Sequence, residues 1–247
     1  MKQALIRYLP LVLLALAWEA VARFELVSRL ALPTLTDVAV AWFDLLRSGE
    51  LLTNAADSVY RGAVGLLLAV VLGGLAGVFM AFSRAVNVLL GPLVELFYPV
   101  PKSALIPITV FWLGFGDGSK ILLIFLGCML PVTIGAYNGA RSTDQALLWS
   151  ARSMGAGRLR VLWDVVVPSA LPELLNGIRT AIALSFVLLV LSELIASRKG
   201  LGFMIGLFGS GGVYDAMFAT VLTVALLGFV ADRSFQLVMR RALAWQG

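Results

Sequence analysis

The side chains that most often carry catalysis or bind metals are almost missing from this chain. Its 247 residues include one cysteine, Cys128, and no histidine. Cys/His metal sites and Ser–His or Cys–His catalytic arrangements are therefore excluded. The G-x-x-x-x-G-K-[ST] pattern of a phosphate-binding loop does not occur either. We expect a chain that is not an enzyme by itself and that binds no nucleotide, metal or other cofactor.

The remaining candidates for chemistry are ionisable and polar residues within long apolar runs. The chain is 60% hydrophobic and 13% charged, with a mean hydropathy of +0.96, whereas soluble domains carry about 25% charged residues. This composition predicts a membrane protein. Its net charge of +5 is explained by basic inner loops, and we expect no nucleic-acid partner. Candidates to line a polar path are Glu95, Tyr98, Pro99, Pro101, Lys102, Asn176, Arg179, Thr180 and Glu193.

Two prolines interrupt the third apolar run. Pro99 and Pro101 lack backbone N–H groups and prevent a regular helix there. A helix broken at membrane depth is tolerated only where it is buried in protein or faces a watery cavity. Glu95 and Lys102 flank the break. They either line a path or form a structural pair with each other or with a neighbouring helix.

Arg179 in the fifth run also has two interpretations. It either meets an anionic solute, or it extends to the inner headgroups or pairs with Glu173. The second interpretation is favoured. Asn176 and Thr180 share a polar face with Glu173, and Glu193 lies near the far end of the run.

Apolar runs of the length of a membrane span recur through the chain. They cover residues 5–21, 58–82, 86–113, 120–137, 168–196 and 217–230. They predict an all-α, polytopic membrane protein with about six transmembrane helices in a single domain, residues 1–247. The first run is also compatible with a signal peptide that is cleaved after an A-x-A site, although a retained span is favoured.

The segments between the runs are predicted from their polarity and their glycines. Residues 24–57 are expected to form an outer loop with a short amphipathic helix over 38–46, capped by Thr36 or Asp37. Residues 198–212 are expected to form a glycine-rich loop.

Small residues recur every four positions on two of the runs and predict close helix contacts. They are Ala69, Gly73, Gly77 and Ala81 in the second run, and Gly177, Ala181 and Ser185 in the fifth. Static packing is favoured over a moving interface for the first of these strips.

Basic residues indicate the orientation of the chain. With both termini inside, the inner side holds Lys2, Arg7, Arg84, Arg141, Arg152, Arg158, Arg160, Arg233, Arg240 and Arg241. The outer side then holds Arg23, Arg29, Arg47, Arg61, Lys120, Arg198 and Lys199. The excess on the inner side favours an even number of spans with both termini in the cytoplasm.

The longest basic segment between apolar runs covers residues 149–168. A short helix is predicted over 143–154, capped by Ser142 or Thr143. Ala151 and Gly155 lie four residues apart on one face, where they leave a notch for another surface. The glycines at 155 and 157 then end the helix.

This segment resembles the EAA loop of permease subunits of ATP-binding-cassette (ABC) importers: E-A-A, three residues, G, nine residues, I-x-L-P. Ala151, Gly155 and Pro168 fill the last Ala, the Gly and the Pro, whereas Trp149 stands in place of the Glu. The sub-pattern A-R-x-x-G-A followed by P-x-A-L-P is similar to the sulfonate, taurine and nitrate branch of these permeases.

The resemblance implies a type I ABC importer permease fold in a bacterial cytoplasmic membrane, with a coupling loop over about 141–168. It implies a homodimer in the lipid bilayer, bound by ABC ATPase subunits that hold ATP and Mg²⁺, and by a periplasmic or extracellular solute-binding protein. The residues that would meet the ATPase are Ala151, Arg152, Ser153, Met154, Gly155, Ala156 and Pro168.

The implied solute is a small sulfonate, taurine, nitrate or a similar organic or anionic compound. Two other functions stay open at this stage. A secondary transporter driven by an ion gradient would show paired broken helices in two repeated halves, and only one clear break is found. A non-transporting membrane scaffold would not need ionisable residues within its spans.

Overall fold

The computed structural model describes residues 2–28 and 31–246, in which the regular elements are all helices and no β-strand occurs. The elements are α1 Lys2–Arg23, α2 Leu35–Arg47, α3 Glu50–Phe82, α4 Arg84–Phe97, η1 Lys102–Leu105, α5 Ile106–Leu113, α6 Asp117–Arg141, α7 Gln145–Ser153, α8 Arg158–Val161, η2 Leu162–Val166, α9 Val167–Ala196, α10 Leu201–Ser210, α11 Tyr214–Ala242 and η3 Ala244–Gln246. Arg29, expected on the outer side, lies outside the described residues, as do the side chains of Lys2 and Arg7.

Four helical runs in the described part of the chain are long and apolar enough to cross a membrane. They are α3, α6, the run from Arg158 to Ala196, and α11. The pair formed by α4 and η1–α5 is bent by 98° and makes a fifth span if it is counted as one. The predicted first span falls on α1, a helix of 22 residues. The all-α, polytopic fold predicted from the sequence is thus confirmed.

The helices α3 and α9 both pack along α6 through glycines that let the backbones approach. A methyl group at Gly177 would lie 2.5 Å from the carbonyl oxygen of Pro131, and one at Gly135 would lie 2.6 Å from that of Glu173. On the other side of α6, a methyl group at Gly77 would collide with the carbonyl oxygen of Thr133. The predicted close contacts of both small-residue strips are therefore found, and both strips meet the same helix.

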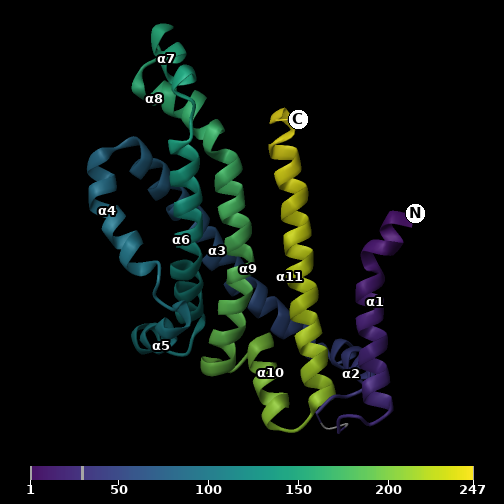
Figure 1. Ribbon diagram of the computed structural model, residues 1–247. Coiled ribbons are helices and arrows are strands. Elements are labelled where there is room, and N and C mark those ends of the chain that lie inside the picture. The colour runs from purple at the N-terminus through teal and green to yellow at the C-terminus, as the bar shows by residue number, and fades with distance from the viewer. Residues whose placement is uncertain (1, 29–30, 247) are drawn as a thin grey trace.

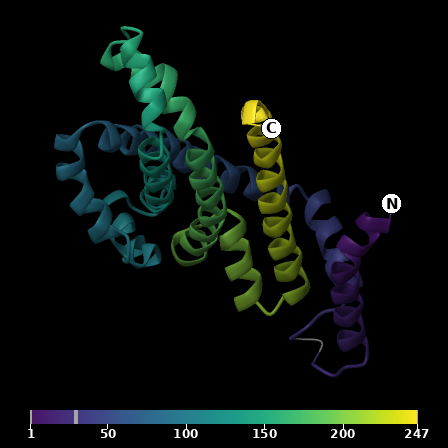
Figure 2. The same ribbon diagram turned by 45° about the horizontal axis from the view of Figure 1, so that its top comes forward.

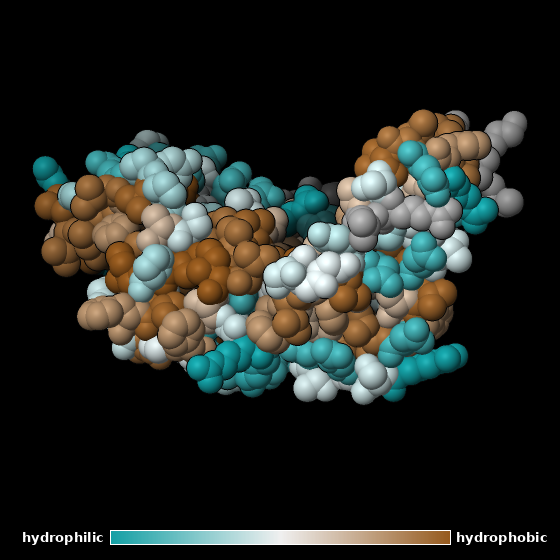
Figure 3. All heavy atoms as spheres, turned by 90° about the horizontal axis from the view of Figure 1, so that it is seen from below, coloured by the Kyte–Doolittle hydropathy of each residue, from teal (hydrophilic) through white to brown (hydrophobic). Residues whose placement is uncertain are grey.

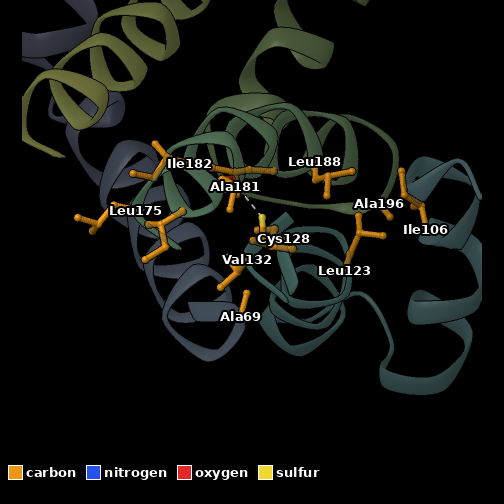
Figure 4. Close-up of a cluster of buried hydrophobic side chains, with 13 residues drawn as sticks. Ala69, Ile106, Leu123, Cys128, Val132, Leu175, Ala181, Ile182, Leu188 and Ala196 are labelled. Carbon is orange, nitrogen blue, oxygen red and sulfur yellow. Dashed lines mark hydrogen bonds between the residues drawn. The ribbon is translucent and has the colours of Figure 1, made fainter. Parts of the chain in front are cut away.

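The main hydrophobic core fills the space between these three helices (Figure 4). Ala69 of α3, Val132 of α6 and Ala181 of α9 are fully buried in it. Cys128 is buried in the same cluster, and its Sγ donates to the carbonyl oxygen of Ala181 at 3.3 Å, which fits the packing role expected for it. Ile106 of α5 joins the cluster, so the broken span is tied to the core at its second half.

The two ends of the molecule carry different elements (Figure 1). The last turn of α11 and the pair α7 and α8 lie toward one end, whereas α2, α5 and α10 lie toward the other, and α1 runs from that second end to about mid-height. In two views the pair α4 and α5 flanks the bundle on one side, and α1 stands on the opposite side next to α11 (Figures 1 and 2). The ring of Trp18 meets that of Phe218 edge-on at 5.2 Å, so α1 contacts α11.

Three predicted boundaries are wrong. The loop expected over 24–57 ends early, because α3 already begins at Glu50. The short helix within it, α2, is capped by Thr34, whose side chain accepts from the Asp37 N–H, and not by Thr36 or Asp37. The loop expected over 198–212 is mostly the helix α10, since its apolar side chains pack on α9 and α11. The fifth span does not begin at Pro168, because residues 158–196 form one helical run through the π-helical segment η2.

We expect the Gly77→Ala substitution to destabilise the protein, because its new methyl group meets backbone that cannot yield easily. Overpacking of this kind typically costs about 1–3 kcal/mol. Gly74→Ala is the matched control, because its methyl group would lie no closer than 3.8 Å to Leu174 while the gain in helix propensity is the same. Thermal unfolding in detergent should show a lower midpoint for Gly77→Ala alone; equal midpoints would contradict the close contact.

Candidate functional site

The broken span contains the first group of candidate residues. Pro99 and Pro101 lie between α4 and η1, where the chain turns. The ammonium group of Lys102 donates to the carbonyl oxygens of Phe97 at 2.6 Å, Tyr98 at 3.1 Å and Val100 at 2.6 Å. Lys102 therefore binds the end of its own broken helix, and it does not pair with Glu95.

The arrangement at Lys102 follows from backbone chemistry. The last carbonyl groups of a helix have no partner within the helix, and the two prolines remove N–H donors from the residues that follow. A lysine placed just beyond the helix supplies three donors and a charge that complements the carboxyl-terminal end of α4. Because unpaired carbonyl groups are costly at membrane depth, Lys102 stabilises the bend.

Glu95 and Tyr98 are exposed on the outside of α4, so neither is part of a closed site within this chain. A narrow hollow of about 210 Å³ lies on the other face of α4, between that helix, α3 and α6. Its lining is apolar apart from Lys102 and Thr133. The Thr133 hydroxyl is the one buried side-chain N or O atom in the described residues that has no hydrogen-bond partner.

Arg179 pairs with a residue that the sequence did not suggest. Its guanidinium meets Asp232 of α11 in a two-point contact, with Nε–Oδ1 at 2.7 Å and Nη2–Oδ2 at 3.3 Å. Arg179 therefore forms an ion pair, as the favoured interpretation allowed, but its partner is Asp232 and not Glu173. Asn176 and Thr180 are exposed on the same helix, and the Thr180 hydroxyl donates to the Asn176 carbonyl oxygen.

Glu193 is fully buried in a cluster of polar groups at the end of the bundle that carries α10. Arg61 of α3 is 1% exposed and donates through Nη1 to the Glu193 carboxylate at 2.6 Å. The hydroxyl of Ser58 lies 2.9 and 2.8 Å from the two carboxylate oxygens. The Gly202 N–H also donates to the carboxylate, at 2.9 Å. Glu193 therefore joins helices in this structure and is not exposed to a path.

Further bonds extend this cluster to α6 and to the turn before α10. The Arg61 Nε donates to Asp117 at 2.8 Å, and its Nη1 also donates to the Lys199 carbonyl oxygen at 2.9 Å. The ammonium group of Lys120 is buried beside it and donates to the carbonyl oxygens of Ala196 and Phe115. One set of charge-assisted hydrogen bonds thus connects four helices. Buried charges require such partners, because an unpaired charge in the interior is costly in free energy.

Arg61 and Lys120 were expected only to lie on the outer side of the membrane, and their burial was not foreseen. Both are 1% exposed. A signal for Arg61 did exist: Ser58, Arg61 and Gly65 follow the helical spacing of the small-residue strip on α3, so they lie on the buried face of that helix.

The other end of the molecule carries α7, which matches the predicted short helix. Asp144 caps it, with its side chain accepting from the Ala146 N–H at 2.8 Å, in place of the expected Ser142 or Thr143. At its carboxyl end the Ala156 N–H donates to the Ala151 carbonyl oxygen at 3.0 Å, and the Gly155 N–H to that of Arg152 at 3.0 Å. Gly155 has a φ of 79°. This is a Schellman motif, which explains why the glycine follows the alanine by four residues.

Apolar side chains are exposed around α7 and α8. Met154 is 79% exposed, and Trp149, Leu147, Leu159 and Trp163 are exposed as well. Ala151 is buried against the small core that α7 shares with Val161, Leu162 and Ala170, whereas Arg152 and Ser153 face solvent. Pro168 is exposed in the first turn of α9. This end therefore offers an apolar and basic surface on a helix that is firmly capped.

The geometry defines a polytopic helical membrane protein with one broken span and a short capped helix that protrudes at one end. Residues 69–243 match the family model described as "Binding-protein-dependent transport system inner membrane component". The chain belongs to this family and is a multi-pass membrane permease of the ABC transporter type.

Two relatives resemble the chain over nearly its whole length. The "Taurine transport system permease protein TauC" of Escherichia coli is 36% identical over 96% of this chain and 88% of the relative. The "Putative aliphatic sulfonates transport permease protein SsuC" of Bacillus subtilis is 34% identical over 96% of this chain and 86% of the relative. The membrane subunit fold also matches a solved chain of the MetNI methionine ABC transporter, with a TM-score of 0.69 and 18% identity over 79% of this chain and 97% of that chain.

We expect Glu193→Gln to destabilise the protein, because it leaves Arg61 buried with less compensating charge. Breaking a buried pair costs about 3–5 kcal/mol, and we expect a loss near the lower end because Asp117 still pairs with Arg61. Glu173→Gln is the matched control on α9, since Glu173 is exposed. Unfolding midpoints in detergent should fall for Glu193→Gln only; an unchanged midpoint would show that the cluster does not stabilise the fold.

Proposed function

We propose that this permease imports taurine or small aliphatic sulfonates across the cytoplasmic membrane of a bacterium. The observation that carries the proposal is the extent of its likeness to taurine and aliphatic-sulfonate permeases, which covers 96% of the chain in both cases. Nitrate and similar small anions are the alternatives within the same chemistry. Selection among them would lie largely in a separate solute-binding protein.

The energy source in this proposal is an ABC ATPase that binds at α7. Support comes from the exposed apolar residues of that end and from its capped, rigid helix. The proposed contact residues are the accessible ones at the α7 carboxyl end, namely Arg152 to Ala156, with Pro168 beyond them; Ala151 is buried and would act through the packing of α7. ATP and Mg²⁺ would be held by the ATPase, and the permease would bind no cofactor and catalyse no reaction.

The proposed path for the motion runs through α9. Ala170 at the start of α9 packs in the same small core as Ala151 of α7. Further along α9, Leu188 packs in the main core with Ile106 of the broken span (Figure 4). A push on α7 would therefore reach the bend at Lys102 through one continuous helical run.

The proposed orientation puts α7 and both termini on the cytoplasmic side. Its support is that α7 and the C-terminus lie toward one end of the molecule, and that α1 points from the opposite end in the same direction (Figure 1). The arginines near that end belong to the loop after α6 and to the last turn of α11, as the positive-inside rule requires of a cytoplasmic face. The opposite end, with α2, α5 and α10, would then meet the solute-binding protein.

The chain is further proposed to work as a homodimer. Seen from the end that carries α5 and α10, hydrophobic side chains cover much of the side formed by α4 and α5 (Figure 3). Phe111 of α5 is 86% exposed, and Trp112, Leu89 and Val88 are exposed on the same elements. A second copy would cover part of this surface, and lipid would cover the rest.

The test of the proposed function is purification of the tagged chain from native membranes, combined with uptake measurements. We expect an ATPase and a solute-binding protein to co-purify. We also expect a strain without the chain to lose uptake of labelled taurine or alkanesulfonates. Recovery of the chain alone, with uptake driven by an ion gradient in vesicles, would overturn the proposal. Normal sulfonate uptake in the deletion strain, with loss of nitrate uptake, would overturn the assignment of the solute.

For the coupling surface we predict that Gly155→Val abolishes association with the ATPase and leaves membrane insertion intact. A β-branched residue is strained at the φ of 79° that Gly155 adopts, so the end of α7 must rearrange. Gly157→Val is the matched control, since Gly157 has a φ of −70° and open space around it. Co-purification should be lost only for Gly155→Val, and normal recovery of the ATPase with that variant would sink the assignment.

A further inference from the structure

A large hollow lies between the short helices α7 and α8 and the ends of α3 and α6. Its volume is about 860 Å³, which is in the range of ligand sites. Ala81 and Phe82 at the end of α3 line it on one side, and Val161 and Val166 contribute further apolar wall. The polar lining comes mainly from the loop after α6 and from α7 and α8. The hollow is thus half apolar and half polar, and it opens where membrane-spanning helices end.

Three arginines from three different elements line this hollow: Arg141, Arg152 and Arg158. Its lining contains no acidic residue. Among the described residues Arg152 and Arg158 form no ion pair, and Arg141 donates only to the hydroxyl of Tyr137, over whose ring it also lies. The neighbouring Arg160 differs, because it pairs with Asp164 and is not part of the lining.

Uncompensated arginines that surround a hollow create a positive potential, and guanidinium groups bind phosphate oxygens with paired hydrogen bonds. Thr143 and Gln145 add hydrogen-bonding side chains to the same lining. The apolar wall beside them suits the glycerol and the first methylene groups of a lipid. Basic hollows on the cytoplasmic side of membrane proteins bind anionic headgroups for this reason.

We propose that this hollow binds the phosphate group of an anionic phospholipid from the inner leaflet. The choice of leaflet rests on the proposed orientation, whereas the binding itself does not. Because Arg141 belongs to α6, Arg152 to α7 and Arg158 to α8, a bound phosphate holds the protruding helices to the bundle. The bound lipid therefore determines how rigidly α7 is connected to the membrane-spanning helices, and so how much of a displacement of α7 reaches them.

The test is native mass spectrometry of the full-length chain in detergent, titrated with phosphatidylglycerol and, separately, with phosphatidylethanolamine. We expect the wild-type chain to retain phosphatidylglycerol preferentially. Arg158→Gln should weaken this binding about tenfold, the effect of losing one charge-assisted hydrogen bond. Arg160→Gln removes the same net charge from the same helix, and we expect wild-type binding for it. If Arg158→Gln does not fold, Arg141→Gln takes its place.

Two results would overturn the proposal. One is equal phosphatidylglycerol binding by Arg158→Gln and Arg160→Gln, which would mean that the net charge of the chain, and not the hollow, attracts the lipid. The other is binding of inorganic phosphate or sulfate that depends on Arg158, without any preference for phosphatidylglycerol, which would assign the hollow to a free anion. Neither measurement involves transport or the ATPase, so failure of the lipid proposal is distinguishable from failure of the proposed function.

Discussion

The contact of α6 with two other helices is the constraint on which the rest of the fold depends. Glycines on α3 approach one side of α6, and Gly177 of α9 meets the backbone of Pro131 and Gly135 on the other. In a bilayer, apolar side chains are buried equally well by lipid and by another helix, so the hydrophobic effect does not drive helices together. Their association depends instead on this kind of close backbone contact. A helix pair held at backbone distance cannot slide without collision, and the three helices therefore form one rigid unit.

The buried polar cluster adds a second restraint, because it also opposes rotation of the three helices about their axes. Arg61 of α3 donates both to Glu193 of α9 and to Asp117 of α6, near the end of the bundle that carries α10. Hydrogen bonds between charged groups depend strongly on direction and distance. A turn of α9 about its axis would leave Glu193 unpaired inside the protein, at a large cost in free energy. The same carboxylate binds the Gly202 N–H, so it also fixes the start of α10.

The sequence predicted what local chemistry determines. The end of α7 could be predicted because a Schellman motif needs only a few consecutive residues, with a glycine where φ is positive. The small-residue strips could be predicted because the period of a helix puts them on one face. The ion pairs could not, since Arg61 and Glu193 are separated by 132 residues and Arg179 and Asp232 by 53. The helix α10 was missed because its glycines suggested a loop, although Leu201 and Met204 are buried in a hydrophobic cluster.

The bend at Lys102 shows how a broken span can be both irregular and stiff. Three carbonyl groups share one ammonium group, so any change in the bend must lengthen several charge-assisted bonds together. In the proposed mechanism, a small displacement of α9 would reach this bend. Because its bonds are shared, the bend would then either keep its conformation or rearrange as a unit. The unpaired Thr133 hydroxyl lies beside the hollow next to that bend, where a rearrangement could give it a partner.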